Sequence, residues 1–157
     1  MTLLRSALLV LLALSTWPVG TASAQAMPVD DSRSQVMAST VKLNWDDTGP
    51  AANRSSILTG SFTVVVRLDV SQWRGQRGRI YHVLPAQPAT PIRATWTSQG
   101  VLTPGTLRDG ERTLVYVGPI DTDLIEDTLR MTIEADGNRL SRQEQLRFSF
   151  EFEPDLP

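Results

Sequence analysis

The sequence contains no cysteine among its 157 residues, and only one histidine. Without cysteine the chain can form no disulfide bond, no thiolate metal site and no lipid-bearing cysteine anchor. Extracellular eukaryotic domains of this size usually carry disulfides, so their absence favours a bacterial periplasm or cell surface. The folded protein must therefore take its stability from its hydrophobic core.

The chain also lacks an apolar run long enough to cross a membrane, which requires about 20 residues. A shorter apolar run at 7–14 follows Arg5 and precedes the small residues Ala22-Ser23-Ala24. This three-part order is typical of a secretory signal peptide. We expect residues 1–24 to be removed after Ala24, leaving a periplasmic or secreted protein with no transmembrane or lipid anchor.

Charge is nearly balanced, with 15 basic and 17 acidic residues. Removing the leader removes Arg5 and no acid, so the mature chain carries 14 minus 17, or −3. This balance argues against a nucleic acid partner. The remaining 133 residues, 157 minus 24, suit a single domain.

Long helical patterns are absent after Ala24, whereas apolar and polar residues alternate in several segments. The clearest are 62–70, 128–135 and 146–153, and such alternation is typical of half-buried strands. Residues 25–37 show no period and are expected to form a flexible N-terminal lead. We predict that 38–157 form one all-β domain, an antiparallel β-sandwich of immunoglobulin-like architecture with seven or eight strands. A small closed β-barrel is the alternative.

Several local patterns refine this expectation. Asp136-Gly137-Asn138 predicts a hairpin turn between the last two strands. Thr113 to Val117 is apolar on both faces, which indicates a central strand. Ile57 and Leu58 before Gly60 predict either a separate short strand or one long strand kinked at the glycine. Asp123 and Glu126 are spaced for a capping box over a single helical turn.

The sequence shows little sign of catalysis. His82 has Tyr81 and Val83 as neighbours in a short strand pattern, and we interpret it as a surface or sheet-face histidine. No serine lies in a Gly-x-Ser-x-Gly elbow. Acids at Asp46 and Asp121 could serve a hydrolase only if they faced a second carboxylate across a substrate. We therefore predict a protein that is not an enzyme and needs no cofactor.

One acidic segment is a weak calcium candidate. Asp121, Asp123, Glu126 and Asp127 place four carboxylates within seven residues, and calcium prefers clustered oxygen ligands. The segment lacks the glycine and the later glutamate of an EF-hand loop. The ordinary interpretation is a solvated turn, and no metal site is predicted.

The segment from Trp73 to Tyr81 is the main candidate for ligand or partner binding. Trp73, Arg74, Arg77, Arg79 and Tyr81 combine aromatic faces with guanidinium groups, and both are enriched at binding hot spots. The alternative is an ordinary loop in which Trp73 covers the edge of the core and the arginines are solvated.

Three functions follow from these patterns. The first is a non-enzymatic exported β-sandwich that contacts an envelope or surface protein, as an accessory of a surface or assembly system. The second is a carbohydrate-binding module that uses Trp73, Tyr81 and the loop arginines. A hydrolase ranks last.

Overall fold

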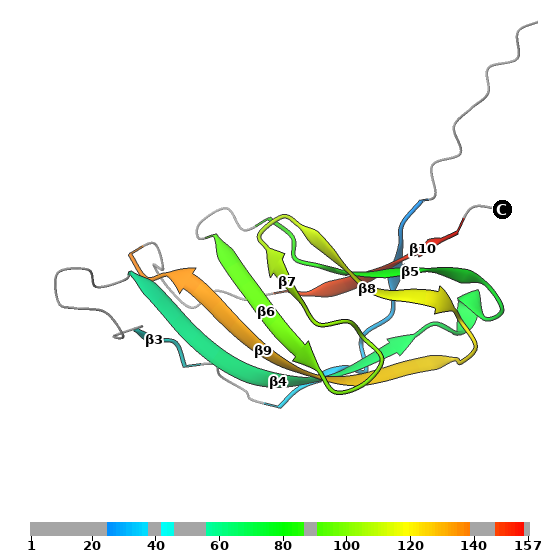
Figure 1. The fold of residues 1–157 in the computed structure, drawn as a ribbon, viewed down its shortest axis with the longest axis horizontal. Helices are drawn as coiled ribbons and strands as arrows, with labels where there is room; N and C mark the ends of the chain where they lie inside the picture. Colours follow the sequence, from blue (N-terminus) through cyan, green and yellow to red (C-terminus); the bar gives the residue numbers. More distant parts are fainter. Residues whose placement is uncertain (1–24, 38–41, 46–55, 87–90, 139–146, 156–157) are drawn as a thin grey trace, which may run out of the picture.

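The computed structural model describes residues 25–37, 42–45, 56–86, 91–138 and 147–155. These residues form two antiparallel sheets packed face to face, which is a β-sandwich (Figure 1). Sheet A has the order β1-β10-β5-β8, and sheet B has the order β2-β4-β9-β6-β7, with β3 also paired to β4. The strands are β1 (Met27–Val29), β2 (Gln35–Val36), β3 (Asn44–Trp45), β4 (Ile57–Asp69), β5 (Arg77–Val83), β6 (Ile92–Ser98), β7 (Gly105–Arg108), β8 (Arg112–Pro119), β9 (Leu124–Asp136) and β10 (Ser149–Pro154).

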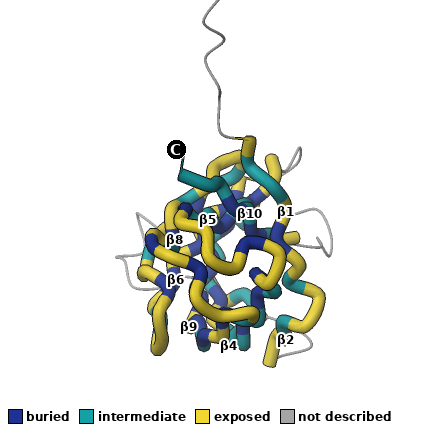
Figure 2. The backbone as a smooth tube through the Cα atoms, turned by 90° about the vertical axis from the view of Figure 1, so that its right-hand side faces the viewer, coloured by how far each residue is buried: buried dark blue, intermediate teal, exposed yellow. Residues whose placement is uncertain are grey.

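The predicted all-β sandwich is confirmed, and the closed barrel is wrong because the described strand pairings leave two separate sheets. Seven strands have four or more residues, and three further strands have two or three. Alternation directs one side of each strand inward, so that buried residues fill the space between the sheets (Figure 2). Trp96 and Phe152, one from each sheet, are the largest fully buried side chains.

The segment 25–37 differs from the expected flexible lead, because it contains strands β1 and β2. Val29 pairs with Phe150 in sheet A, and Val36 pairs with Val64 in sheet B. A bridge between Asp30 and Asp69 lies between these pairings. Figure 1 shows this blue segment running from one sheet to the other. Backbone hydrogen bonds to the edges of both sheets hold this segment, and such bonds do not require alternating apolar residues in its sequence.

The predicted hairpin between the last two strands is wrong, although both strands exist. β9 pairs with β4 and β6 in sheet B, whereas β10 pairs with β1 and β5 in sheet A. Each strand has one apolar face, and these faces meet across the core. Asp136 ends β9, and Gly137 and Asn138 follow it in a turn, with Gly137 N–H donating to the Ser56 carbonyl at 2.6 Å.

Three further expectations meet a clear outcome. Residues 57–69 form one continuous strand, β4, in which Gly60 pairs in register with Ile133. The segment 113–117 is not central, because β8 is an edge strand of sheet A. The predicted helical turn at 123–126 is wrong, because β9 begins at Leu124. The one short helix among the described residues is a 3₁₀ turn at Ser71–Trp73.

Candidate functional site

The outer face of sheet A, here called the A face, brings together part of the predicted site. Strand pairing arranges its side chains in three parallel columns. The β10 column is acidic, the β5 column is basic and aromatic, and the β8 column is largely apolar. The columns are Glu151, Glu153 and Asp155; Arg77, Arg79, Tyr81 and Val83; and Arg112, Leu114, Val117 and Pro119.

Register explains why these residues meet. Tyr81 lies opposite Glu151 on one side and Leu114 on the other, and Arg79 lies between Glu153 and Val117. A bulge in β8 shifts the register between Ile80 and Tyr81. Because of this shift, Leu114 and Val117 both face outward although they are three residues apart.

Ion pairs hold the arginines of the A face. Arg79 lies 3.2 Å from Asp155 and 3.9 Å from Glu153, and Arg112 lies 3.1 Å from Glu153 and 3.8 Å from Glu151. Arg77 lies 3.5 Å from Asp155, so three arginines face three carboxylates. These exposed pairs contribute little to stability individually. They do fix the guanidinium groups and leave the face close to neutral.

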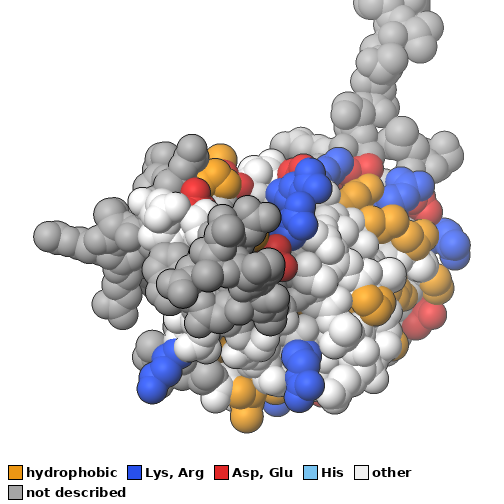
Figure 3. All heavy atoms as spheres, turned by 60° about the vertical axis from the view of Figure 1, so that its left-hand side comes forward, with side chains coloured by type: hydrophobic (Ala, Val, Ile, Leu, Met, Phe, Trp, Pro, Cys, Tyr) orange, Lys and Arg blue, Asp and Glu red, His pale blue; other side chains and the backbone are white. Residues whose placement is uncertain are grey.

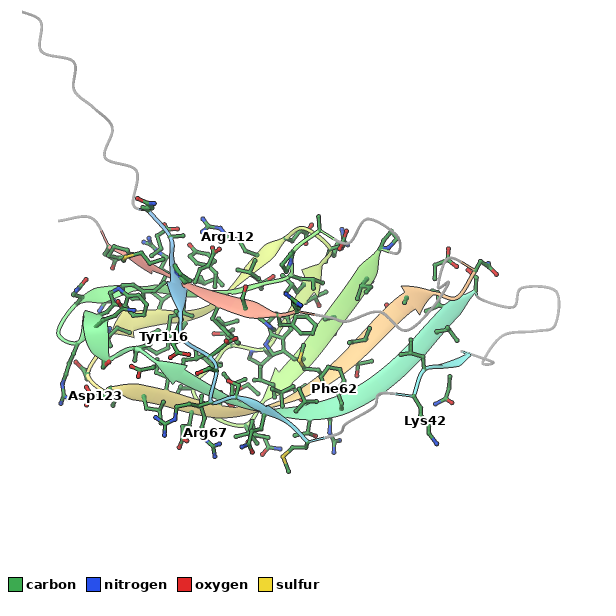
Figure 4. The ribbon with its side chains drawn as sticks, turned by 180° about the vertical axis from the view of Figure 1, so that it is seen from behind. Lys42, Phe62, Arg67, Arg112, Tyr116 and Asp123 are labelled. Carbon is green, nitrogen blue, oxygen red and sulfur yellow. The ribbon has the colours of Figure 1, made fainter. Side chains whose placement is uncertain are left out.

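Tyr81 is covered by one of these arginines. The Arg112 guanidinium carbon lies 4.2 Å from the centre of the Tyr81 ring, which is cation–π geometry. Figure 4 shows Arg112 on the outer side of sheet A. The ring face that would stack on a sugar is therefore occupied by a guanidinium group.

An apolar strip lies beside the charged columns. Leu114 is 40% exposed and Val117 is 51% exposed, although both belong to a regular strand. Figure 3 shows hydrophobic side chains among arginine and acidic side chains on the upper part of the molecule, where Figure 1 shows sheet A. Arg112, Leu114 and Val117 were not among the predicted site residues. The segment 113–117 is apolar on both faces, and this pattern fits an exposed edge strand as well as the central strand that was predicted.

The structure removes Trp73 from the predicted site. Trp73 is 3% exposed, and its ring stacks on Phe152 with centroids 4.6 Å apart. Its environment is the core, where an aromatic ring gains most from burial. Arg74 is separate from the A face as well, because it follows the 3₁₀ turn and pairs with Asp123 at 2.8 Å. Of the five predicted residues, Arg77, Arg79 and Tyr81 share the A face.

His82 is buried in the core, where the sequence interpretation had a surface or sheet-face histidine. Its ring is 1% exposed and stacks on Phe150 with centroids 4.6 Å apart, while Trp96 meets it edge-on at 4.9 Å. Its Nδ1 has no hydrogen-bond partner in the described part of the chain. Burial lowers the pKa of His82 to about 4, so the imidazole is neutral at physiological pH.

The four acids of the weak calcium candidate do not gather. Asp127 is buried and accepts hydrogen bonds from Ser98 Oγ at 2.8 Å and Leu102 N–H at 2.7 Å. Glu126 faces outward and pairs with Arg67 at 2.7 Å, because neighbouring strand residues point to opposite faces. Figure 4 shows Asp123 at one end of the sandwich. Among the described residues, no group of three or more potential ligands could hold a metal ion.

Comparison with known proteins finds no relative of this chain. No protein-family model matches the chain, and neither a curated protein nor a solved structure is significantly similar to it. In the ranges that the structure describes, no helix is long and apolar enough to cross a membrane. The protein is an antiparallel β-sandwich whose A face carries acidic, basic and apolar columns of side chains. Its function is therefore argued first from the A face.

Proposed function

We propose that this chain is a non-enzymatic exported β-sandwich that binds another protein of the cell envelope through its A face. The observation that carries the proposal is the exposed apolar strip of Leu114 and Val117 on edge strand β8. Exposed apolar residues on a sheet edge are an aggregation hazard unless they serve recognition. A bound partner would remove both side chains from water.

The residues around the strip support this proposal. Tyrosine and arginine are enriched at the energetic centres of protein interfaces. Here Arg79 and Arg112 are already held by Glu153 and its neighbours, so binding would order few additional side chains. The near-neutral charge of the face favours a partner whose contact surface is apolar at its centre.

Docking onto the face is favoured over addition of a strand to β8. Part of the β8 edge is already occupied, because Thr103 N–H donates to the Val115 carbonyl at 2.7 Å. Strand addition needs a row of accessible backbone groups along the edge. Side chains of the A face, rather than backbone groups of β8, therefore supply the proposed contacts.

Site-specific photo-crosslinking in the producing cell tests the proposal. A photoreactive residue replaces Val117 in the full precursor, and a control precursor carries it at Thr97 on the opposite sheet. We expect one envelope protein to be crosslinked from position 117 and not from position 97. No product, identical products from both positions, or a product made only of two copies of this chain would overturn the proposal.

A matched pair of variants tests the apolar strip itself. In this experiment the photoreactive residue replaces Pro119. The double variant Leu114→Thr, Val117→Thr should then weaken crosslinking at least about tenfold, because central apolar contacts dominate binding. The control changes Val36 and Ile57 to threonine, since these residues are 55% and 41% exposed and lie in sheet B. Equal losses in both double variants would contradict a role for the strip.

A further inference from the structure

The outer face of sheet B, here called the B face, has a different chemistry from the A face. Its centre is a row of hydroxyl groups across four paired strands. Ser61 lies opposite Thr132, Thr132 opposite Thr95, and Thr95 opposite Thr106. Ser61 Oγ lies 3.0 Å from Thr132 Oγ1, and the Thr95 and Thr106 hydroxyl oxygens are 3.4 Å apart.

Arginines flank this hydroxyl row on both sides. On one side, Arg93 lies two residues before Thr95, and Arg108 lies two residues after Thr106. These two arginines are directly opposite each other on β6 and β7. Arg130 lies on the other side, two residues before Thr132 and opposite Thr63 and Thr97. Rows two residues apart are separated by about 7 Å, so the arginine rows are about 14 Å apart.

These arginines are less neutralised than those of the A face. Arg108 and Arg130 are exposed and have no ion pair within the residues that the structure describes. Among the described residues, the ion pair of Arg93 is a long one, 4.0 Å to Glu134, which lies opposite it on β9. Arg93 and Arg108 are like charges directly opposite each other, and this one carboxylate offsets only one of the two. The chain is acidic overall, so this is a local concentration of positive charge.

We infer that the B face binds an anionic polysaccharide across the hydroxyl row. Guanidinium groups on both sides pair with carboxylate or sulfate groups, and the hydroxyls between them hydrogen-bond to sugar hydroxyls. Each serine or threonine hydroxyl has one donor and two acceptor positions, so the contacts within the row leave capacity for a ligand. This inference is independent of the proposed protein contact on the A face.

The composition of the B face separates this ligand from other polyanions. Within the described register of β4, β9, β6 and β7, the hydroxyl row contains no aromatic residue, whereas single-stranded nucleic acids are held largely by stacking on such rings. The row also lacks the apolar residues that enter a lipid bilayer. A neighbouring groove of about 520 Å³ is lined by Arg93 and Arg108 but also by four acids, Asp109, Glu111, Glu134 and Asp136. We therefore assign the polymer to the hydroxyl row and not to the groove.

Binding of the purified mature protein to dextran sulfate and to polygalacturonate tests the inference, with uncharged dextran as the neutral comparison. We expect binding to at least one anionic polymer, weakening with added salt, and none to dextran. Arg108→Gln with Arg130→Gln should raise Kd about tenfold or more. The control, Arg74→Gln with Arg77→Gln, removes the same charge outside the B face and should change Kd less than about twofold.

A second pair of variants tests the hydroxyl row without changing charge. Thr95→Val with Thr132→Val keeps β-branched side chains of similar shape, and we expect Kd to rise about threefold to tenfold. Thermal unfolding confirms that each variant is folded. The inference is overturned if neither anionic polymer binds, if the arginine control loses as much affinity, or if the valine variant binds unchanged. Binding as tight to single-stranded DNA or to phosphatidylglycerol vesicles would also overturn it.

Discussion

At the scale of single residues, the environment decides the role of two polar-tipped rings. The sequence left Trp73 as either a binding residue or a cover for the edge of the core, and it indicated a surface or sheet-face position for His82. Both are buried, at 3% and 1% exposure, and both stack on phenylalanines of β10. His82 faces the core although Tyr81 faces outward, because neighbouring residues of a strand point to opposite sides of a sheet. Trp73 lies instead in the 3₁₀ turn before β5, and its ring packs on Phe152.

His82 predicts an acid-dependent loss of stability. Its folded pKa is about 4, below the ordinary value of 6.5, so the unfolded chain binds a proton more readily. The stability contributed by neutral His82 is fully present above pH 6.5 and is lost as pH falls to about 4, by about 3 kcal/mol. Urea unfolding of wild type and His82→Phe between pH 7.5 and 4 measures this loss.

The His82→Phe variant should show a shallower decline in unfolding free energy, since the remaining pH dependence comes from carboxylates alone. His82→Leu provides a second variant if phenylalanine overpacks the site between Phe150 and Trp96. Identical pH dependence in wild type and both variants would show that His82 does not titrate as expected.

Gly78 allows β10 to approach β5 closely. A Cβ at this position would lie 2.5 Å from Phe152 Cζ and 2.6 Å from the Glu153 carbonyl oxygen. We expect Gly78→Ala to lower the free energy of unfolding by about 1–3 kcal/mol, because Phe152 in turn supports Trp73. Chemical denaturation at neutral pH measures the effect.

Gly75→Ala is the matched comparison for Gly78→Ala. Gly75 has open space around its Cα but a positive φ of 80°, so alanine there costs backbone strain of about 1 kcal/mol without a clash. Adding Phe152→Leu should recover part of the loss in Gly78→Ala and none in Gly75→Ala. Equal recovery in both backgrounds would contradict the proposed contact.

At the scale of elements, strand identity was easier to predict than strand partnership. The alternation at 62–70 and 128–135 predicted strands that the structure contains, with the apolar side buried at Val66, Leu68 and Leu129. The position of a strand within a sheet was not encoded locally. The segment 113–117 is apolar on both sides, which describes a central strand and an exposed edge equally well.

Strand β1 gives a test of the N-terminal segment. Val29 is buried against the core, whereas Val36 in β2 is 55% exposed. Val29→Asp should lower the free energy of unfolding by about 3 kcal/mol or more, because it places a carboxylate in the core. Val36→Asp should change it by less than about 0.5 kcal/mol.

Thermal or urea unfolding of the two aspartate variants provides the measurement. A flexible lead without core contacts would tolerate both substitutions equally, so similar stabilities would contradict the docking of β1 onto β10. A large loss in Val36→Asp alone would contradict the exposed position of β2.

At the scale of the whole molecule, the sandwich presents two faces of opposite design. On the A face, Arg77, Arg79 and Arg112 are neutralised by carboxylates beside an apolar strip. On the B face, Arg108 and Arg130 flank hydroxyl groups and have no carboxylate partner in the described ranges. Because the two proposed contacts lie on opposite faces, binding of a protein to the A face would leave the B face open to a polymer.

The proposed export predicts the first residue of the mature chain. Cleavage after Ala24 would leave Gln25 as the first residue, two positions before β1 begins. We expect the intact mass of protein recovered from outside the cytosol to correspond to residues 25–157, because residues 1–24 have the order that is typical of a signal peptide. Recovery of the 157-residue chain from the cytosol alone would contradict export.

The sequence by itself determined the class of fold, the location of most long strands and which side of the clearly alternating strands is buried. These properties depend on the alternation of apolar residues, which is local. Tertiary structure alone decided that β9 and β10 lie in different sheets, that Trp73 is in the core and that Arg112 covers Tyr81. It also brought Arg93, Arg108 and Arg130 around one hydroxyl row. Such arrangements depend on pairing between distant segments, and a pattern within one strand does not specify its partner.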